Sequence, residues 1–113
     1  MSGVWRWNLI LILLGLCVAA PASARGDAAA GAQKVQQVCA SCHGPEGKSP
    51  TPMYPHLAGQ YPDYLVKALS DYKSGARKNA IMSGFAASLS QQDMENVAAY
   101  FARQPGLTVR PQP

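Results

Sequence analysis

Cys39-Ala40-Ser41-Cys42-His43 is the stretch that decides how this 113-residue chain folds. Two cysteines separated by two residues, with a histidine directly after the second, form a C-x-x-C-H motif. On one helical turn, two thiols at this spacing reach the two vinyl groups of a porphyrin, and the adjacent imidazole lies under the iron. The motif therefore predicts a single covalently attached haem, haem c, held by Cys39, Cys42 and His43.

Other uses of two cysteines fit this chain less well. A thioredoxin-like redox motif lies beside a βαβ unit, whereas the sequence has no strand-like alternation. A structural zinc site needs two further ligands, and His43 and His56 do not form a second pair at regular spacing. A disulfide between Cys39 and Cys42 would suit a protein with two cysteines outside the reducing interior of the cell, but the two-residue spacing followed by histidine is typical of haem attachment.

The amino-terminal segment, positions 1–24, has the pattern of an export signal. Arg6 is the lone charge ahead of an apolar run at residues 9–20, and Ala22-Ser23-Ala24 supplies the small residues of a cleavage site. We predict cleavage after Ala24, a periplasmic location and no permanent membrane anchor, because an apolar run this short cannot span a bilayer. An uncleaved anchor and a lipoprotein attached through Cys17 are the alternatives.

The remaining chain is small and only mildly basic. We predict one domain at residues 25–105 and a disordered tail at residues 106–113. The whole chain carries ten basic and six acidic side chains, and loss of Arg6 leaves nine against six. Two haem propionates would offset most of this excess, so the sequence does not favour nucleic-acid binding. A domain of this size usually needs a stabilising cofactor or cross-link, which fits an attached haem.

The pattern of apolar residues and breakers predicts an all-α fold. A first helix begins after Asp27 as N-cap and runs to about Cys39. A second runs from Pro62 to Gly75, and a third begins with the Ser90-x-x-Asp93 capping box and ends near Gln104. Glycines and prolines predict a loop at residues 43–60, and residues 76–89 are expected to be irregular.

A six-coordinate haem iron needs a second axial ligand besides His43. The candidates are Met53, Met82, Met94 and His56. Met94 shares the apolar stripe of the last helix and is expected in the core, and Met53 and His56 follow the motif so closely that they should lie on the His43 side of the ring. Met82 comes much later in the sequence than His43, which leaves room for the chain to reach the opposite face. We predict Met82 as the ligand, with His56 as the alternative.

The mature chain resembles the class I c-type cytochromes, and among them the single-haem domains of small soluble periplasmic cytochromes of proteobacteria. The likeness covers nearly all of the mature chain and rests on the haem motif, residues 55–60, residues 75–79, Met82, Leu89-Ser90 and residues 97–101. It implies a small class I cytochrome c helical fold wrapped around the haem, with the first and last helices crossing at Gly31 beside Tyr100. It also implies that the carbonyl of Pro55 accepts a hydrogen bond from His43 and that Leu57 packs on the haem edge. Arg77 and Asn79 are expected either to hydrogen-bond a haem propionate or to order the segment that carries Met82.

Ligation by His43 and Met82 predicts an electron carrier, not an enzyme, because no coordination position is left for substrate. The expected partners are redox proteins such as a membrane oxidase, a reductase complex or a dehydrogenase. We hypothesise that a basic cluster of Lys73, Arg77 and Lys78 steers an acidic partner. A gas-binding or peroxide-binding protein with a labile Met82 is one alternative, and a subunit docked permanently on a larger enzyme is another.

Overall fold

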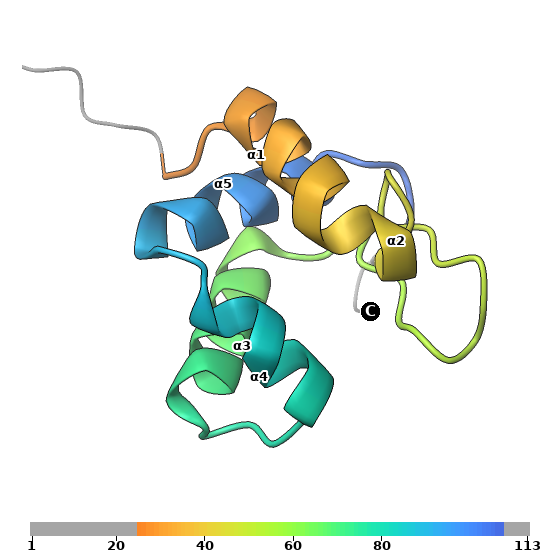
Figure 1. Ribbon diagram of the computed structural model, residues 1–113. Helices are drawn as coiled ribbons and strands as arrows, with labels where there is room; N and C mark the ends of the chain where they lie inside the picture. The colour runs from red at the N-terminus through yellow and green to blue at the C-terminus, as the bar shows by residue number, and fades with distance from the viewer. Residues whose placement is uncertain (1–24, 108–113) are drawn as a thin grey trace, which may run out of the picture.

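The computed structural model describes residues 25–107, and within this range the regular structure is helical (Figure 1). The elements in chain order are α1 (Ala28–Lys34), a π-helical segment (Val35–Cys39), α2 (Ala40–His43), α3 (Pro62–Ser74), α4 (Ala80–Ala87) and α5 (Gln91–Ala102). The all-α prediction is confirmed. No helix within residues 25–107 is long and apolar enough to cross a membrane. The predicted export signal and residues 108–113 of the predicted tail lie outside the described residues.

The first helix begins as the sequence predicts but ends later. The Asp27 carboxylate accepts hydrogen bonds from the backbone N–H groups of Ala29 and Ala30, so Asp27 is the N-cap. Instead of stopping near Cys39, the helix passes through the π-helical segment and continues through α2 to His43. It ends at Gly44, whose φ of 81° suits glycine and stops the helical backbone. The predicted end at Cys39 is therefore wrong by one helical turn.

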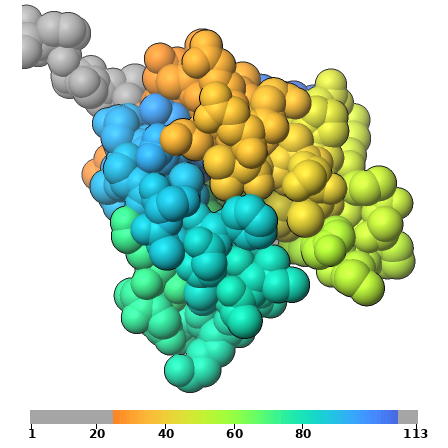
Figure 2. All heavy atoms as spheres, viewed as in Figure 1, coloured from red at the N-terminus to blue at the C-terminus, as the bar shows by residue number. Residues whose placement is uncertain are grey.

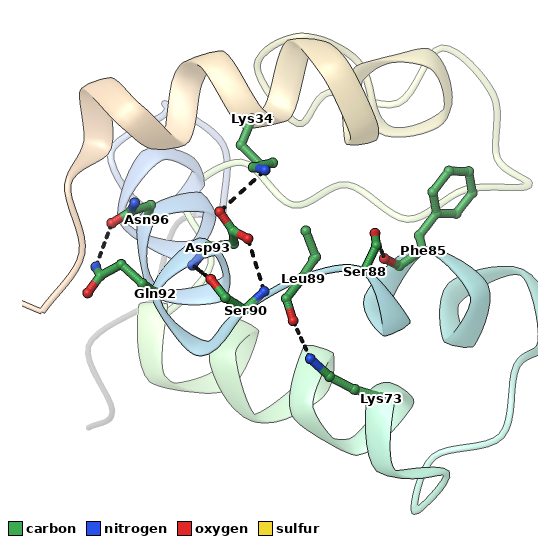
Figure 3. Close-up of polar contacts among 9 residues, drawn as sticks. All are labelled: Lys34, Lys73, Phe85, Ser88, Leu89, Ser90, Gln92, Asp93 and Asn96. Atoms are coloured by element: carbon green, nitrogen blue, oxygen red, sulfur yellow. Dashed lines mark hydrogen bonds and ion pairs between the residues drawn. The ribbon is translucent and has the colours of Figure 1, made fainter.

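The second and last helices have the predicted bounds and caps. α3 has Pro62 at its start and Gly75 in the left-handed conformation at its end. α5 begins with the complete capping box, in which Ser90 and Asp93 each bind the other's backbone N–H (Figure 3). The carboxylate of Asp93 also lies 3.4 Å from the Lys34 ammonium, which ties the start of α5 to α1.

The expectation that residues 76–89 are irregular is wrong. Most of this stretch is α4, which is capped by Asn79, whose side chain accepts a hydrogen bond from the Met82 N–H. A helix this short gives little periodicity to detect, and Gly84 lowers helix propensity within it. Residues 44–61 form the long loop that the breakers predict.

The core lies where α1, α3 and α5 meet. Its buried residues are Val35, Leu65, Val97, Ala98 and Phe101. α5 lies across α1 in Figure 1, and the two backbones approach closely at Gly31, where an added Cβ would lie 2.0 Å from the carbonyl oxygen of Asn96 and 3.0 Å from the Cβ of Tyr100. The crossing that the resemblance implies is thus present, and glycine is required at that point because no side chain fits.

Candidate functional site

A cavity of about 430 Å³ lies between the end of the first helix, the long loop, α3 and α4. α2, α4 and the loop of residues 44–61 are neighbours on the face shown in Figure 2. Val97 and Phe101 of α5 also reach the lining, so the cavity rests directly on the core. Its walls therefore come from every major segment of the described chain.

The C-x-x-C-H motif forms one wall of the cavity. Cys39 ends the π-helical segment, and Cys42 and His43 lie in α2. Both cysteines are free thiols and half-buried, both line the cavity, and His43 lines it as well and is only 7% exposed. Burial raises the pKa of the Cys39 thiol to about 11, an effect that the nearby Lys34 only partly opposes. The Cys39 sulfur is therefore uncharged at neutral pH, as suits an apolar wall.

The imidazole of His43 is held by the loop opposite it. Its Nδ1 lies 2.9 Å from the carbonyl oxygen of Pro55, as the resemblance implies. A carbonyl can only accept, so Nδ1 carries the proton and the lone pair of Nε2 is left as a ligand. Such an acceptor behind the ring fixes both its orientation and its tautomer and makes Nε2 a stronger donor. Tyr54 packs edge-on with ring centroids 6.3 Å apart, which further limits rotation.

Met82 lines the cavity from α4. Of the other three candidates for second ligand, Met53 and His56 also line the cavity, whereas Met94 does not. Met94 lies in the core, as predicted, and is only 2% exposed. Its sulfur lies 3.6 Å from the Ser70 hydroxyl. Met53 lies in the long loop and is 80% exposed. The Nδ1 of His56 accepts a hydrogen bond from the Ser49 N–H, so its ring is already used to order the loop that follows the motif.

Leu57 also lines the cavity, half-buried and packed against the core cluster. The structure therefore brings together all six residues that the sequence proposed for the site. These are Cys39, Cys42, His43, Pro55, Leu57 and Met82.

Tyr64, Tyr72 and Phe85 were not assigned to the site from the sequence, yet all three line the cavity. Arg77 donates to the Tyr64 hydroxyl at 3.4 Å and lies 4.8 Å from the centre of the Tyr72 ring. Phe85 joins them from α4. The four-residue spacing from Ile81 to Phe85 was the one local sign that α4 presents an apolar face here.

The chemistry of the lining fits a large, flat, mostly apolar group with a negative edge. Four of the large apolar side chains that are exposed within residues 25–107 gather around the cavity, namely Met53, Tyr64, Ile81 and Phe85. The lining contains Arg77 but no aspartate or glutamate among the described residues. Two thiols, a nitrogen lone pair and a thioether complete the donor set. These features match a haem attached at Cys39 and Cys42.

Comparison with known proteins gives the same assignment. The family model for cytochrome c matches residues 28–104. The chain is 48% identical over 96 residues to cytochrome c4 of Pseudomonas aeruginosa, covering 85% of this chain and 47% of that protein. It is 42% identical over 82 residues to cytochrome c-554(548) of Halomonas halodenitrificans, covering 70% of this chain and 98% of that protein.

A solved structure supports the fold. The crystal structure of reduced recombinant cytochrome c4 from Pseudomonas stutzeri matches with a TM-score of 0.67 and 47% identity, over 73% of this chain and 47% of that one. The chain thus spans about half the length of the cytochrome c4 relatives that it matches.

Proposed function

Because the chain belongs to the cytochrome c family, we propose that it is a periplasmic carrier that passes single electrons between redox proteins. Members of this family carry covalently bound haem c. When bound, that cofactor supplies one-electron exchange between Fe(II) and Fe(III). The chain is accordingly assigned to electron transfer and not to enzymatic catalysis.

Four residues would hold the cofactor. Cys39 and Cys42 would bind the vinyl groups through thioether bonds, which consume both thiols. His43 would offer Nε2 to the iron, while Pro55 keeps the proton on Nδ1. Met82 would offer its thioether from α4. With His43 and Met82 both bound to the iron, no coordination position would be open to substrate, so the bound group would exchange electrons without binding one.

The observation that carries this proposal is the convergence of the four donors on one cavity. Cys39, Cys42 and His43 come from the end of the first helix, whereas Met82 comes from α4, which follows only after the long loop and α3. The lining between them is mostly apolar. A thioether ligand and an apolar surrounding both stabilise Fe(II) relative to Fe(III), so we expect the positive reduction potential of a respiratory carrier.

We further propose that the protein is exported by its amino-terminal segment, positions 1–24, and acts free in the periplasm. The pattern around Ala22-Ser23-Ala24 supports export. Its electron donors and acceptors would be redox proteins of the cell envelope, such as a membrane oxidase, a reductase complex or a dehydrogenase. Such partners meet a carrier over a small and transient interface.

Visible absorption spectra of the haem-loaded protein and of three methionine variants test the ligation. We expect a low-spin spectrum with the weak far-red sulfur-to-iron band when oxidised, and loss of that band in Met82→Leu. Met53→Leu and Met94→Leu are the matched controls, because they remove the other two thioethers of residues 25–107. Both controls should keep the band.

Three outcomes would contradict the proposal. Loss of the band in Met53→Leu would move the ligand to the long loop, and a wild-type protein without the band would exclude methionine ligation altogether. Carbon monoxide binding to the reduced wild-type protein would show an open iron position and would favour a gas-binding or peroxide-binding function instead.

A further inference from the structure

Met82 lies in the first turn of α4, and the side chain of Asn79 caps that turn. The Oδ1 of Asn79 accepts a hydrogen bond from the backbone N–H of Met82 at 3.0 Å. Asn79 has extended backbone angles and is the N-cap of the helix, so Met82 is the third helical residue. The first N–H groups of a helix have no partner within the helix, and the cap supplies one here to Met82 itself.

The two ends of α4 are held very differently. At the carboxyl end, Ala86 is fully buried, Leu89 is only 2% exposed, and the Lys73 ammonium donates to the Leu89 carbonyl from α3 (Figure 3). At the amino end, Asn79 and Ala80 are exposed, and Ile81 and Met82 face the cavity and not the protein core. Packing against the core therefore anchors the end that follows Met82, whereas the turn that carries Met82 is held by its cap and by whatever group fills the cavity.

We propose that Asn79 is a positioning residue for Met82, whose cap keeps the first turn of α4 closed and the thioether directed to the site. This inference rests on Met82 as the axial ligand, as proposed above. Opening of the turn carries the Met82 backbone and its sulfur away from the cavity. The strength of the cap thus sets how often an external ligand can reach the iron position that Met82 otherwise occupies.

Binding of imidazole to the oxidised, haem-loaded protein measures this opening, because imidazole binds only where Met82 has left. Its apparent affinity is proportional to the open fraction while that fraction is small. Replacing a capping side chain by alanine weakens a cap enough to raise the open fraction roughly 2- to 30-fold. We therefore expect Asn79→Ala to raise the apparent affinity for imidazole by about fivefold, and to lower the pH at which the far-red band disappears.

Two matched variants separate this role from a general loss of stability. Asn79→Ser keeps a side-chain oxygen at the N-cap, and serine caps a helix about as well as asparagine. The imidazole affinity of this variant should therefore stay close to the wild-type value. Ser90→Ala removes the cap of α5. The Ser90 hydroxyl accepts a hydrogen bond from the backbone N–H of Asp93, three residues later, but α5 carries no proposed iron ligand. Ser90→Ala should lower the midpoint of thermal unfolding by an amount similar to Asn79→Ala and leave the imidazole affinity unchanged.

The results can contradict either the role of Asn79 alone or the ligation by Met82 as well. An imidazole affinity that is unchanged in Asn79→Ala, equally raised in Ser90→Ala, or not restored in Asn79→Ser overturns the positioning role while leaving Met82 as ligand. A wild-type spectrum without the sulfur-to-iron band overturns the ligation itself, and the role of Asn79 with it.

Discussion

Gly31 and Asn96 mark the point where α1 and α5 touch, because a Cβ at residue 31 would lie 2.0 Å from the Asn96 carbonyl oxygen. That oxygen belongs to helix backbone and cannot move aside alone. We therefore expect Gly31→Ala to force the two helices apart and to lower the free energy of unfolding by about 1–3 kcal/mol. Denaturant unfolding of the haem-loaded protein, followed by the helical circular dichroism signal, measures this change.

Gly84→Ala is the control for Gly31→Ala. Gly84 also lies within a helix, but an added Cβ there meets nothing within 4 Å. Alanine favours the helix over glycine, so this variant should be neutral or more stable by about 0.5–1 kcal/mol. If the two variants unfold at the same denaturant concentration, close contact at the crossing is not what requires glycine at residue 31.

Tyr100 links α5 to the loop that follows the haem motif. Its hydroxyl donates to the carbonyl oxygen of Pro45 at 2.8 Å, across 55 residues of sequence. Tyr100→Phe should cost about 0.5–1.5 kcal/mol of unfolding free energy, toward the lower end because the bond is accessible to water. Hydrogen exchange of the loop amides should rise at the same time. Tyr61→Phe, at a side chain that is 60% exposed, should change neither measurement.

The sequence predicts those elements whose ends are marked by local chemistry. Asp27, Pro62 and Ser90 each begin a helix for a reason contained within a few residues, and the structure confirms all three starts. The end of the first helix was placed one turn too early, at Cys39, although the residue that ends it is Gly44, whose φ of 81° suits glycine. α4 was missed because a short helix containing a glycine forms too weak a pattern, although Asn79 is a good cap.

The site divides in a similar way. The C-x-x-C-H motif names three of its residues directly, since their chemistry depends only on local spacing. Tyr64 and Phe85 reach the cavity only because α3 and α4 pack together beside it. No spacing rule within one helix predicts a wall shared by two, so these residues could be found only from the tertiary arrangement.

Asp93 gives the stability a predictable dependence on pH. The backbone N–H of Ser90, with a smaller contribution from Lys34, lowers the pKa of this carboxyl below its ordinary value. Its stabilising effect is therefore present above pH ~3.9, the usual value for an unfolded aspartate, and is lost as the pH falls through the lower value of the folded state. Asp93→Asn should be less stable than wild type by about 0.5–1 kcal/mol at pH 7.

Thermal unfolding of wild type and Asp93→Asn between pH 7 and pH 3 tests this dependence. The difference between their midpoints should be constant down to about pH 4 and should shrink below it. Asp71→Asn is the control, since Asp71 pairs only with the exposed Lys67 at 2.7 Å, and such surface pairs contribute little. A difference between wild type and Asp93→Asn that persists unchanged at the lowest pH would show that the carboxylate charge is not what stabilises α5.

Lys78 is the member of the basic cluster that can test electrostatic steering. Arg77 contacts Tyr64 and Tyr72, and Lys73 donates to the Leu89 carbonyl, so reversing either charge would also disturb packing. Lys78 is exposed in the loop before α4. Lys78→Glu should slow oxidation of the reduced protein by the anion hexacyanoferrate(III) about fivefold at roughly 0.01 M ionic strength.

The salt dependence and a matched variant complete this last test. At roughly 1 M salt the Debye length falls to about 3 Å, and the rates of wild type and Lys78→Glu should converge. Arg103→Glu makes the same change of charge at the end of α5, which lies well away from the loop before α4 in Figure 1, and it should leave the rate nearly unchanged. If Arg103→Glu slows oxidation as much as Lys78→Glu, the net charge of the protein governs the encounter. If only Lys78→Glu slows it, electrons leave beside the loop that leads into Met82, and an acidic partner would dock there.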